Sequence, residues 1–212
     1  MDISVRPATQ DRSRQSQQRV LDAGEQILAD HGYDGFSIAE VSERSGVSVG
    51  SIYQRFRNKD VLFTALQDQI LKRLDREQEQ LFLDIQTDGL SDDAVINAAI
   101  QGMADHFQRH EALLRVMILR GATDEETRAR GSQSSLALAR HFETFLIDHV
   151  RDFAHENPRI ATDVSFRMIY ASLTRRIMSG PTFESATAID WDRFVSEMSR
   201  ACRAYLIGAS PR

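Results

Sequence analysis

The sequence predicts an all-α fold of about nine helices. Three observations support this prediction. Apolar residues recur at spacings of three and four over long stretches, as they do on the buried face of a helix. No stretch alternates apolar and polar residues between hairpin turn signals, so strands are not expected. The 4 prolines and 11 glycines among the 212 residues fall mostly between the helical stretches, where they end helices rather than interrupt them.

The first predicted helix spans about residues 13–31, after a polar segment over residues 1–11 that we expect to be disordered or arm-like. Its inward face is formed by four apolar residues at helical spacing: Val20, Ala23, Ile27 and Leu28. Gly32 marks its end, because glycine adopts the left-handed conformation of a helix terminus at little cost.

Residues 37–56 predict two short helices joined by a tight turn. Ser37 and Glu40 have the spacing of a capping box, in which each side chain accepts a backbone N–H at the helix start. Gly46 suits the turn, and Ser48 can cap the second helix. This spacing is typical of a DNA-binding helix-turn-helix, whose second helix is slim enough to enter a major groove.

The second helix of this motif is expected to have an inward and an outward face. The inward residues are Val47, Ile52 and Phe56, and the outward residues are Val49, Gly50, Ser51, Gln54 and Arg55. The whole chain carries a net charge of -5, but residues 44–60 hold four basic residues against one acidic residue. Positive charge is therefore concentrated where contact with DNA is expected.

Six further helices are predicted after the motif, over about residues 59–84, 91–110, 111–120, 124–155, 160–179 and 190–207. Asn58 can cap the first of them. The length of this helix indicates that it leaves one domain and enters the next. We therefore expect one domain over residues 12–60 and a second over residues 61–212.

Residues 12–66 resemble the DNA-binding domain of the TetR/AcrR family of bacterial transcriptional repressors. The segments that carry the resemblance are RVLDAGEQILADHGYDGF, SIAEVSERSGVS and VGSIYQRFRNKDVLF. The resemblance implies a homodimeric regulator, most often a repressor, that leaves a palindromic DNA operator when a small molecule binds the C-terminal domain. The alternative within the same fold is a DNA-bound scaffold that recruits a protein partner and has no small-molecule ligand.

Spacing and resemblance together predict the residues that contact double-stranded DNA: Ser37, Ser48, Val49, Gly50, Ser51, Tyr53, Gln54, Arg55 and Lys59. Val49 suits a thymine methyl group, and Arg55 suits a bidentate contact with guanine. Tyr53 is similar to the phosphate-binding tyrosine of the family. The alternatives are packing within the domain for Tyr53 and an ordinary surface position for Arg55.

The resemblance also implies a ligand pocket and a dimer interface in the second domain. Residues that could line an apolar pocket for an apolar or amphipathic effector are Met103, Phe107, Met117, Phe142, Phe145, Phe166, Met168 and Tyr170. Candidates for an interface built from the last two helices are Val164, Met168, Ala171, Trp191, Phe194, Val195, Met198 and Tyr205. Ordinary core packing is the alternative for members of both sets.

Other classes of function are not expected. His106 and His110 stand at the spacing i, i+4, but without a third ligand in the pattern we expect two surface histidines and no metal. No catalytic constellation is recognisable, so neither an enzyme nor a cofactor is predicted. No apolar stretch approaches a membrane span. The single cysteine, Cys202, and the polar N-terminus fit a cytoplasmic protein.

Overall fold

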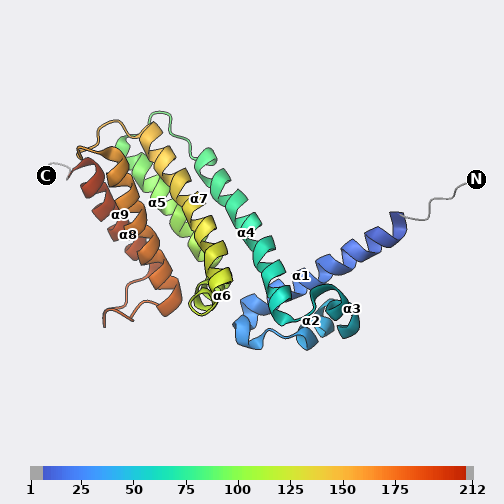
Figure 1. Cartoon of the computed structure of the whole chain (residues 1–212). Helices are drawn as coiled ribbons and strands as arrows, with labels where there is room; N and C mark the ends of the chain where they lie inside the picture. Colours follow the sequence, from blue (N-terminus) through green and yellow to red (C-terminus); the bar gives the residue numbers. More distant parts are fainter. Residues whose placement is uncertain (1–6, 209–212) are drawn as a thin grey trace, which may run out of the picture.

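The computed structural model describes residues 7–208, with side chains described from residue 11 onwards. Nine helices and no strand occur in this range (Figure 1). They are α1 (Pro7–Gly35), α2 (Ile38–Ser45), α3 (Val49–Phe56), α4 (Lys59–Asp84), α5 (Asp92–Arg109), α6 (Glu111–Gly121), α7 (Glu125–His149), α8 (Pro158–Ser179) and α9 (Trp191–Ile207). The predicted all-α fold is confirmed.

Helix α1 differs from the expectation at its N-terminal end, whereas Gly32 breaks the regular helix where its end was expected. It begins at Pro7, so residues 7–11 are helical where an arm was expected, and residues 1–6 lie outside the described range. Proline is well tolerated at the first helical position, because the N–H that it lacks has no intrahelical partner there. At the other end, a kink at Gly32 (φ 67°, ψ -169°) precedes a last turn to Gly35. The polar composition of residues 7–11 led to the expectation of an arm, but a polar segment can also be helical.

Helix α7 ends at His149 rather than near residue 155. The buried Val150 is extended, with φ -89° and ψ 129°. Further on, the Ala154 N–H donates to the Leu206 carbonyl at 2.8 Å. A tertiary hydrogen bond to α9 therefore takes a backbone group that an eighth helical turn would have used, and this contact leaves no signal in the apolar periodicity.

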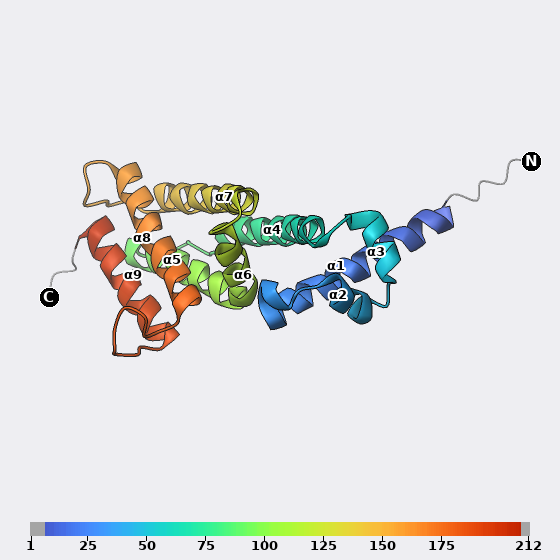
Figure 2. The same cartoon turned by 60° about the horizontal axis from the view of Figure 1, so that its bottom comes forward.

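The apolar side chains form two separate buried clusters. The first joins α1, α2, α3 and the N-terminal part of α4, and it includes Phe36, Leu62 and Leu66. The second lies within the bundle of α4, α5, α7, α8 and α9. Helix α4 runs from the first group of helices into the bundle (Figure 1). Helix α6 lies between the bundle and α1 and contributes Leu113 and Val116 to the first cluster (Figure 2).

No helix in the part of the chain that the structure describes is both long and apolar enough to cross a lipid bilayer.

Candidate nucleic-acid interface and interior cavity

The start and end of α2 are fixed by local hydrogen bonds. Ser37 caps the helix by accepting the Glu40 N–H at 3.1 Å. The Glu40 carboxylate pairs with Arg44 at 3.3 Å instead of completing a capping box. Gly46 ends the helix in the left-handed region (φ 66°, ψ 19°), and its N–H donates to the Ser42 carbonyl at 3.0 Å. These bonds set the angle at which the chain enters α3.

Helix α3 presents a narrow exposed ridge. Ser48 caps it by accepting the Ser51 N–H at 3.3 Å, while Ile52 and Phe56 are buried in the first cluster. The side chains of Val49 and Tyr53 are 41% and 49% exposed. The solvent-facing positions of the helix are Val49, Gly50, Ser51, Tyr53 and Gln54. A helix with one buried and one free face has the shape that enters a major groove.

Arg55 lies at the edge of the outward face, where α1 holds its side chain. Its side chain is half-buried, and its guanidinium donates to Ser13 of α1 twice, at 3.1 Å to the carbonyl and at 2.7 Å to the hydroxyl. The partner lies 42 residues away in the chain, so local spacing could not reveal it. In the free protein Arg55 ties α3 to α1.

Lys59, at the start of α4, lies in a cluster around the Tyr33 ring. Its Nζ donates to the Tyr33 carbonyl at 3.0 Å and lies 4.0 Å from the ring centroid. The Tyr33 hydroxyl donates to Asp60 at 2.5 Å, and burial together with this bond raises the pKa of Tyr33 to about 12. Arg120 of α6 stacks on the same ring at 4.5 Å and pairs with Asp60 at 3.4 Å. The cluster joins α1, α4 and α6.

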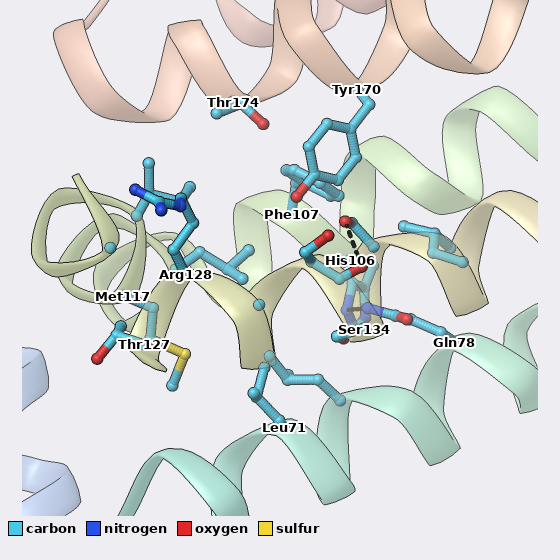
Figure 3. A pocket seen from close by; sticks show the side chains of 18 of the residues that line it. Leu71, Gln78, His106, Phe107, Met117, Thr127, Arg128, Ser134, Tyr170 and Thr174 are labelled. Carbon is cyan, nitrogen blue, oxygen red and sulfur yellow. Dashed lines mark hydrogen bonds between the residues drawn. The ribbon is translucent and has the colours of Figure 1, made fainter. Parts of the chain in front are cut away.

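A cavity of about 370 Å³ lies between α4, α5, α6, α7 and α8 (Figure 3). Tyr170 and Thr174 point into it from α8, and Leu71 faces them from α4 (Figure 3). Most of its wall is apolar: Leu71, Leu74, Phe107, Leu114, Met117, Ile118, Leu138 and Tyr170. Its size and lining are those of a small-molecule site.

Three of the eight predicted pocket residues line this cavity: Phe107, Met117 and Tyr170. The other five do not. Met103, Phe142 and Phe145 are packed in the core of the bundle. Phe166 and Met168 border hollows elsewhere on α8. The sequence analysis missed the leucines and the polar residues of the wall, because in a sequence an apolar residue beside a cavity resembles one in a filled core.

The polar part of the wall centres on Gln78 and His106. Gln78 is 5% exposed, and its amide nitrogen lies 3.3 Å from Nε2 of His106. The Gln78 Oε1 and the Thr174 hydroxyl have no hydrogen-bond partner among the described residues. Burial, with the nearby His110, lowers the pKa of His106 to about 4, so this imidazole is uncharged at neutral pH. The cavity thus offers neutral hydrogen-bonding groups around Gln78, and Arg128 places a charged group elsewhere on its lining (Figure 3).

The sequence analysis predicted that His106 and His110 lie at the surface, and this prediction is wrong. His106 is 2% exposed, and the His110 side chain is 11% exposed. Glu77 of α4 faces both, with Oε2 at 2.6 Å from His110 Nε2 and at 3.9 Å from His106 Nδ1. The third polar group comes from a helix about 30 residues earlier, which is why the helical spacing of the histidines did not reveal it.

The outer surface of α8 and α9 carries most of the predicted interface residues. A shallow groove there is bordered by Val164, Met168, Ala171, Phe194, Met198 and Tyr205. Met168 is 42% exposed, and Ala171 is exposed as well. Trp191 is half-buried against the bundle core, whereas Val195 is 1% exposed. Val195 is therefore a core residue and cannot form part of a surface, which corrects the prediction for that position.

Residues 20–66, which span most of α1, α2, α3 and the start of α4, match the family described as bacterial regulatory proteins, tetR family. The chain is also similar over most of its length to characterised regulators. It is 25% identical to the HTH-type transcriptional repressor AcnR of Corynebacterium efficiens over 82% of this chain and 83% of that protein. It is 26% identical to the regulator BetI of Cronobacter sakazakii over 80% and 83% of the two chains.

Solved structures share the whole fold. A TetR transcription regulator from Haloarcula marismortui superimposes with a TM-score of 0.64 at 18% identity, over 91% of this chain and 96% of that one. The regulator FadR of Bacillus subtilis, in complex with stearoyl-CoA, gives a TM-score of 0.60 at 12% identity over 91% and 99%. With a capped helix-turn-helix, an exposed α3 and a helical second core, the chain carries a TetR-family DNA-binding domain and is similar over most of its length to DNA-binding transcriptional regulators.

Proposed function

We propose that the protein is a homodimeric repressor that leaves a palindromic operator when an apolar or amphipathic small molecule enters the cavity. The observation that carries this proposal is that two side chains belong to both parts of the molecule. Leu74 and Met117 line the cavity and also pack in the apolar cluster of α1–α3. A ligand that displaces either side chain must therefore disturb the packing of the DNA-binding helices.

A second connection runs through the Tyr33 cluster. Arg120 lies at the end of α6, next to Gly121 and Ala122 of the cavity wall, and contacts Tyr33 and Asp60 at the other side. A shift of α6 on ligand binding would move both contacts. We propose residues 12–60 for DNA contact and residues 61–212 for ligand binding and dimerisation, with α4 and α6 packing in both units.

The cavity favours a ligand-responsive regulator over a DNA-bound scaffold without a ligand. A scaffold has no need of an apolar space of about 370 Å³ among these helices, whereas a ligand-responsive regulator requires one. The acyl chain of the stearoyl-CoA bound to FadR illustrates a ligand with a long apolar part in the same fold. For this chain, the neutral polar groups around Gln78 suit an effector with an uncharged polar end.

The proposed DNA contacts come from the ridge of α3 and from its neighbours. Val49 and Ser51 would meet base edges, and Tyr53 would donate to a phosphate. The remaining proposed contacts are Ser37, Ser48, Gly50, Gln54 and Lys59. Arg55 would reach a guanine only after releasing Ser13, so its contribution to affinity is reduced by the two hydrogen bonds that it gives up.

Gly50→Ala should separate DNA binding from folding. A Cβ at this position meets nothing within 4 Å, so alanine fits the free protein and should stabilise α3 by up to about 1 kcal/mol. On DNA, the added methyl group would hold the helix away from the groove. We expect operator affinity, measured by fluorescence anisotropy on a site selected from random duplexes, to fall about ten-fold, or roughly 1.4 kcal/mol.

Gly131→Ala is the matched control. Gly131 is also helical with open space around its Cβ, but it lies in α7. This variant should bind the operator like the unchanged protein. Equal affinity of the two glycine variants would show that the backbone of α3 does not approach DNA.

Thr174→Phe should make the protein insensitive to its effector. The phenyl ring would occupy the cavity while leaving α3 untouched, so operator affinity should be kept and release should require at least about ten-fold more effector. The effector is first identified by screening amphipathic molecules for those that release the unchanged protein from the operator. Thr187→Phe, in the exposed loop after α8, is the control and should respond normally. Full release of Thr174→Phe at the normal concentration would exclude this cavity as the effector site.

A further inference from the structure

Three side chains that the DNA interface does not require meet between α4 and α5, beside the cavity. They are Glu77, His106 and His110, and one ligand atom from each lies within 4.8 Å of the others. The two histidines share one face of α5 because they stand four residues apart. Helix α4 supplies the carboxylate from the facing side.

Hydrogen bonding explains only part of this arrangement. Glu77 Oε2 and His110 Nε2, at 2.6 Å, form an ordinary bonded pair. His106 Nδ1 also faces the same oxygen, but 3.9 Å is too long for a hydrogen bond. Two metal–ligand bonds of about 2.1 Å span a distance of this order. Turning the Glu77 carboxylate lengthens its contact with His110 enough for an ion to lie among the three atoms.

Gln78 provides a second, independent observation. A histidine that binds metal through one nitrogen commonly donates its other N–H to an oxygen acceptor. If His106 binds through Nδ1, its Nε2 carries that N–H and faces the Gln78 amide at 3.3 Å. The Gln78 Oε1, which is buried and without a partner among the described residues, becomes the acceptor after a half-turn of the amide. Metal binding would thus satisfy a polar atom that is otherwise unsatisfied.

We propose that Glu77, His106 and His110 form a binding site for a zinc-type divalent transition-metal ion that links α4 to α5. Two imidazoles and one carboxylate are a ligand set typical of zinc and cobalt, whereas magnesium and calcium prefer oxygen ligands alone. The set leaves a fourth position for water or another ligand. Of its three side chains, only His106 also lines the cavity proposed for the effector, and the metal titration is carried out without effector.

The ion would act on the helix that carries the DNA-binding unit. Glu77 lies one turn from Arg73, with Oε1 at 3.8 Å from its Nε, and Arg73 holds Glu25 of α1 with two hydrogen bonds at 2.7 and 3.1 Å. The series His110, Glu77, Arg73 and Glu25 therefore connects α5 to α1. Fixing Glu77 on an ion would fix the spacing of α4 and α5 at one end of this series.

The test is titration of the full chain, freed of metal with a chelator, with Zn²⁺ by calorimetry and with Co²⁺ by absorption spectroscopy. We expect one ion per chain, ligand-field bands from Co²⁺, and no competition from Mg²⁺. Glu77→Gln and His110→Gln should each weaken binding by about ten-fold or more. Both residues are partly exposed, so these variants should fold, and their metal-free melting temperatures will verify it.

His141→Gln is the control, since His141 is half-buried on α7 outside the cluster, and it should bind like the unchanged protein. Binding that is unchanged in Glu77→Gln and His110→Gln would overturn the proposal, as would the absence of Co²⁺ bands at saturating cobalt. Operator binding and effector release are measured separately, so failure here leaves the proposed function intact.

Discussion

Replacing Met168 by glutamate is expected to convert the protein to a monomer and to lower its operator affinity by about a hundred-fold. A dimer brings two recognition helices to two half-sites, and the second contact is made at a high effective concentration once the first has formed. A monomer loses this advantage, which is commonly worth a factor of 100 or more. A hundred-fold loss corresponds to about 2.7 kcal/mol.

Met168 lies on the outer surface formed by α8 and α9. Met168 is 42% exposed and borders the apolar groove together with Ala171, Phe194 and Met198. In a two-fold symmetric dimer the same patch faces its copy, so one substitution introduces two carboxylates into the interface. Burying an unpaired charge is costly, whereas in the monomer the glutamate remains in water. The fold of the single chain should therefore be kept.

Leu83→Glu is the control for Met168→Glu. Leu83 is 69% exposed on α4, so the substitution adds the same charge away from α8 and α9. Analytical ultracentrifugation at micromolar concentration should find a dimer for this control and a monomer for Met168→Glu. A Met168→Glu protein that stays dimeric, or a monomer that keeps full operator affinity, would contradict the proposed assembly.

Phe36→Ala is expected to destabilise the DNA-binding unit by about 3–5 kcal/mol, the usual cost of removing a buried phenyl ring. Phe36 is 0% exposed in the cluster of α1–α4, between the end of α1 and the start of α2. Its ring lies close to Gly24, where an added Cβ would be 3.4 Å from Phe36 Cε2. Because glycine has no side chain, nothing at position 24 can move into the space that the missing phenyl ring leaves, and a cavity remains.

Urea unfolding followed by circular dichroism measures this loss, and operator binding should fall with it. Phe183→Ala is the control. That ring is 64% exposed in the loop after α8, where it stacks on Arg175 at 3.7 Å, so its removal should cost less than about 0.5 kcal/mol. Equal stability of the two variants would mean that the cluster around Phe36 does not hold the helix-turn-helix together.

The features that sequence reasoning predicted correctly are local ones. Ser37, Ser48 and Asn58 cap the helices for which they were expected, each by accepting an N–H three residues further on. Gly46 adopts the left-handed conformation that the turn requires. Helix α4 begins and ends at the predicted residues, 59 and 84. Each of these signals depends on groups fewer than five residues apart, so it is present in the chain before any tertiary contact forms.

The features that were wrong or missed depend on distant partners. Arg55 was expected to face outward, but Ser13 of α1 holds it. His106 was expected at the surface, but the bundle buries it beside Glu77 and Gln78. Val195 has the same helical spacing as Met198, yet only one of them reaches the surface. Periodicity gives the apolar face of a helix but not the neighbour that covers it.

The sequence alone therefore determined most helix positions, the helix-turn-helix and the likeness of residues 20–66 to the TetR family, because caps, turns and apolar spacing act within one or two turns of chain. Tertiary structure alone decided which apolar residues border a cavity, which polar groups meet between α4 and α5, and how α6 joins the two cores. The physical reason is that close packing is a property of several helices at once. The same leucine fills a core or lines a cavity depending on side chains more than 30 residues away.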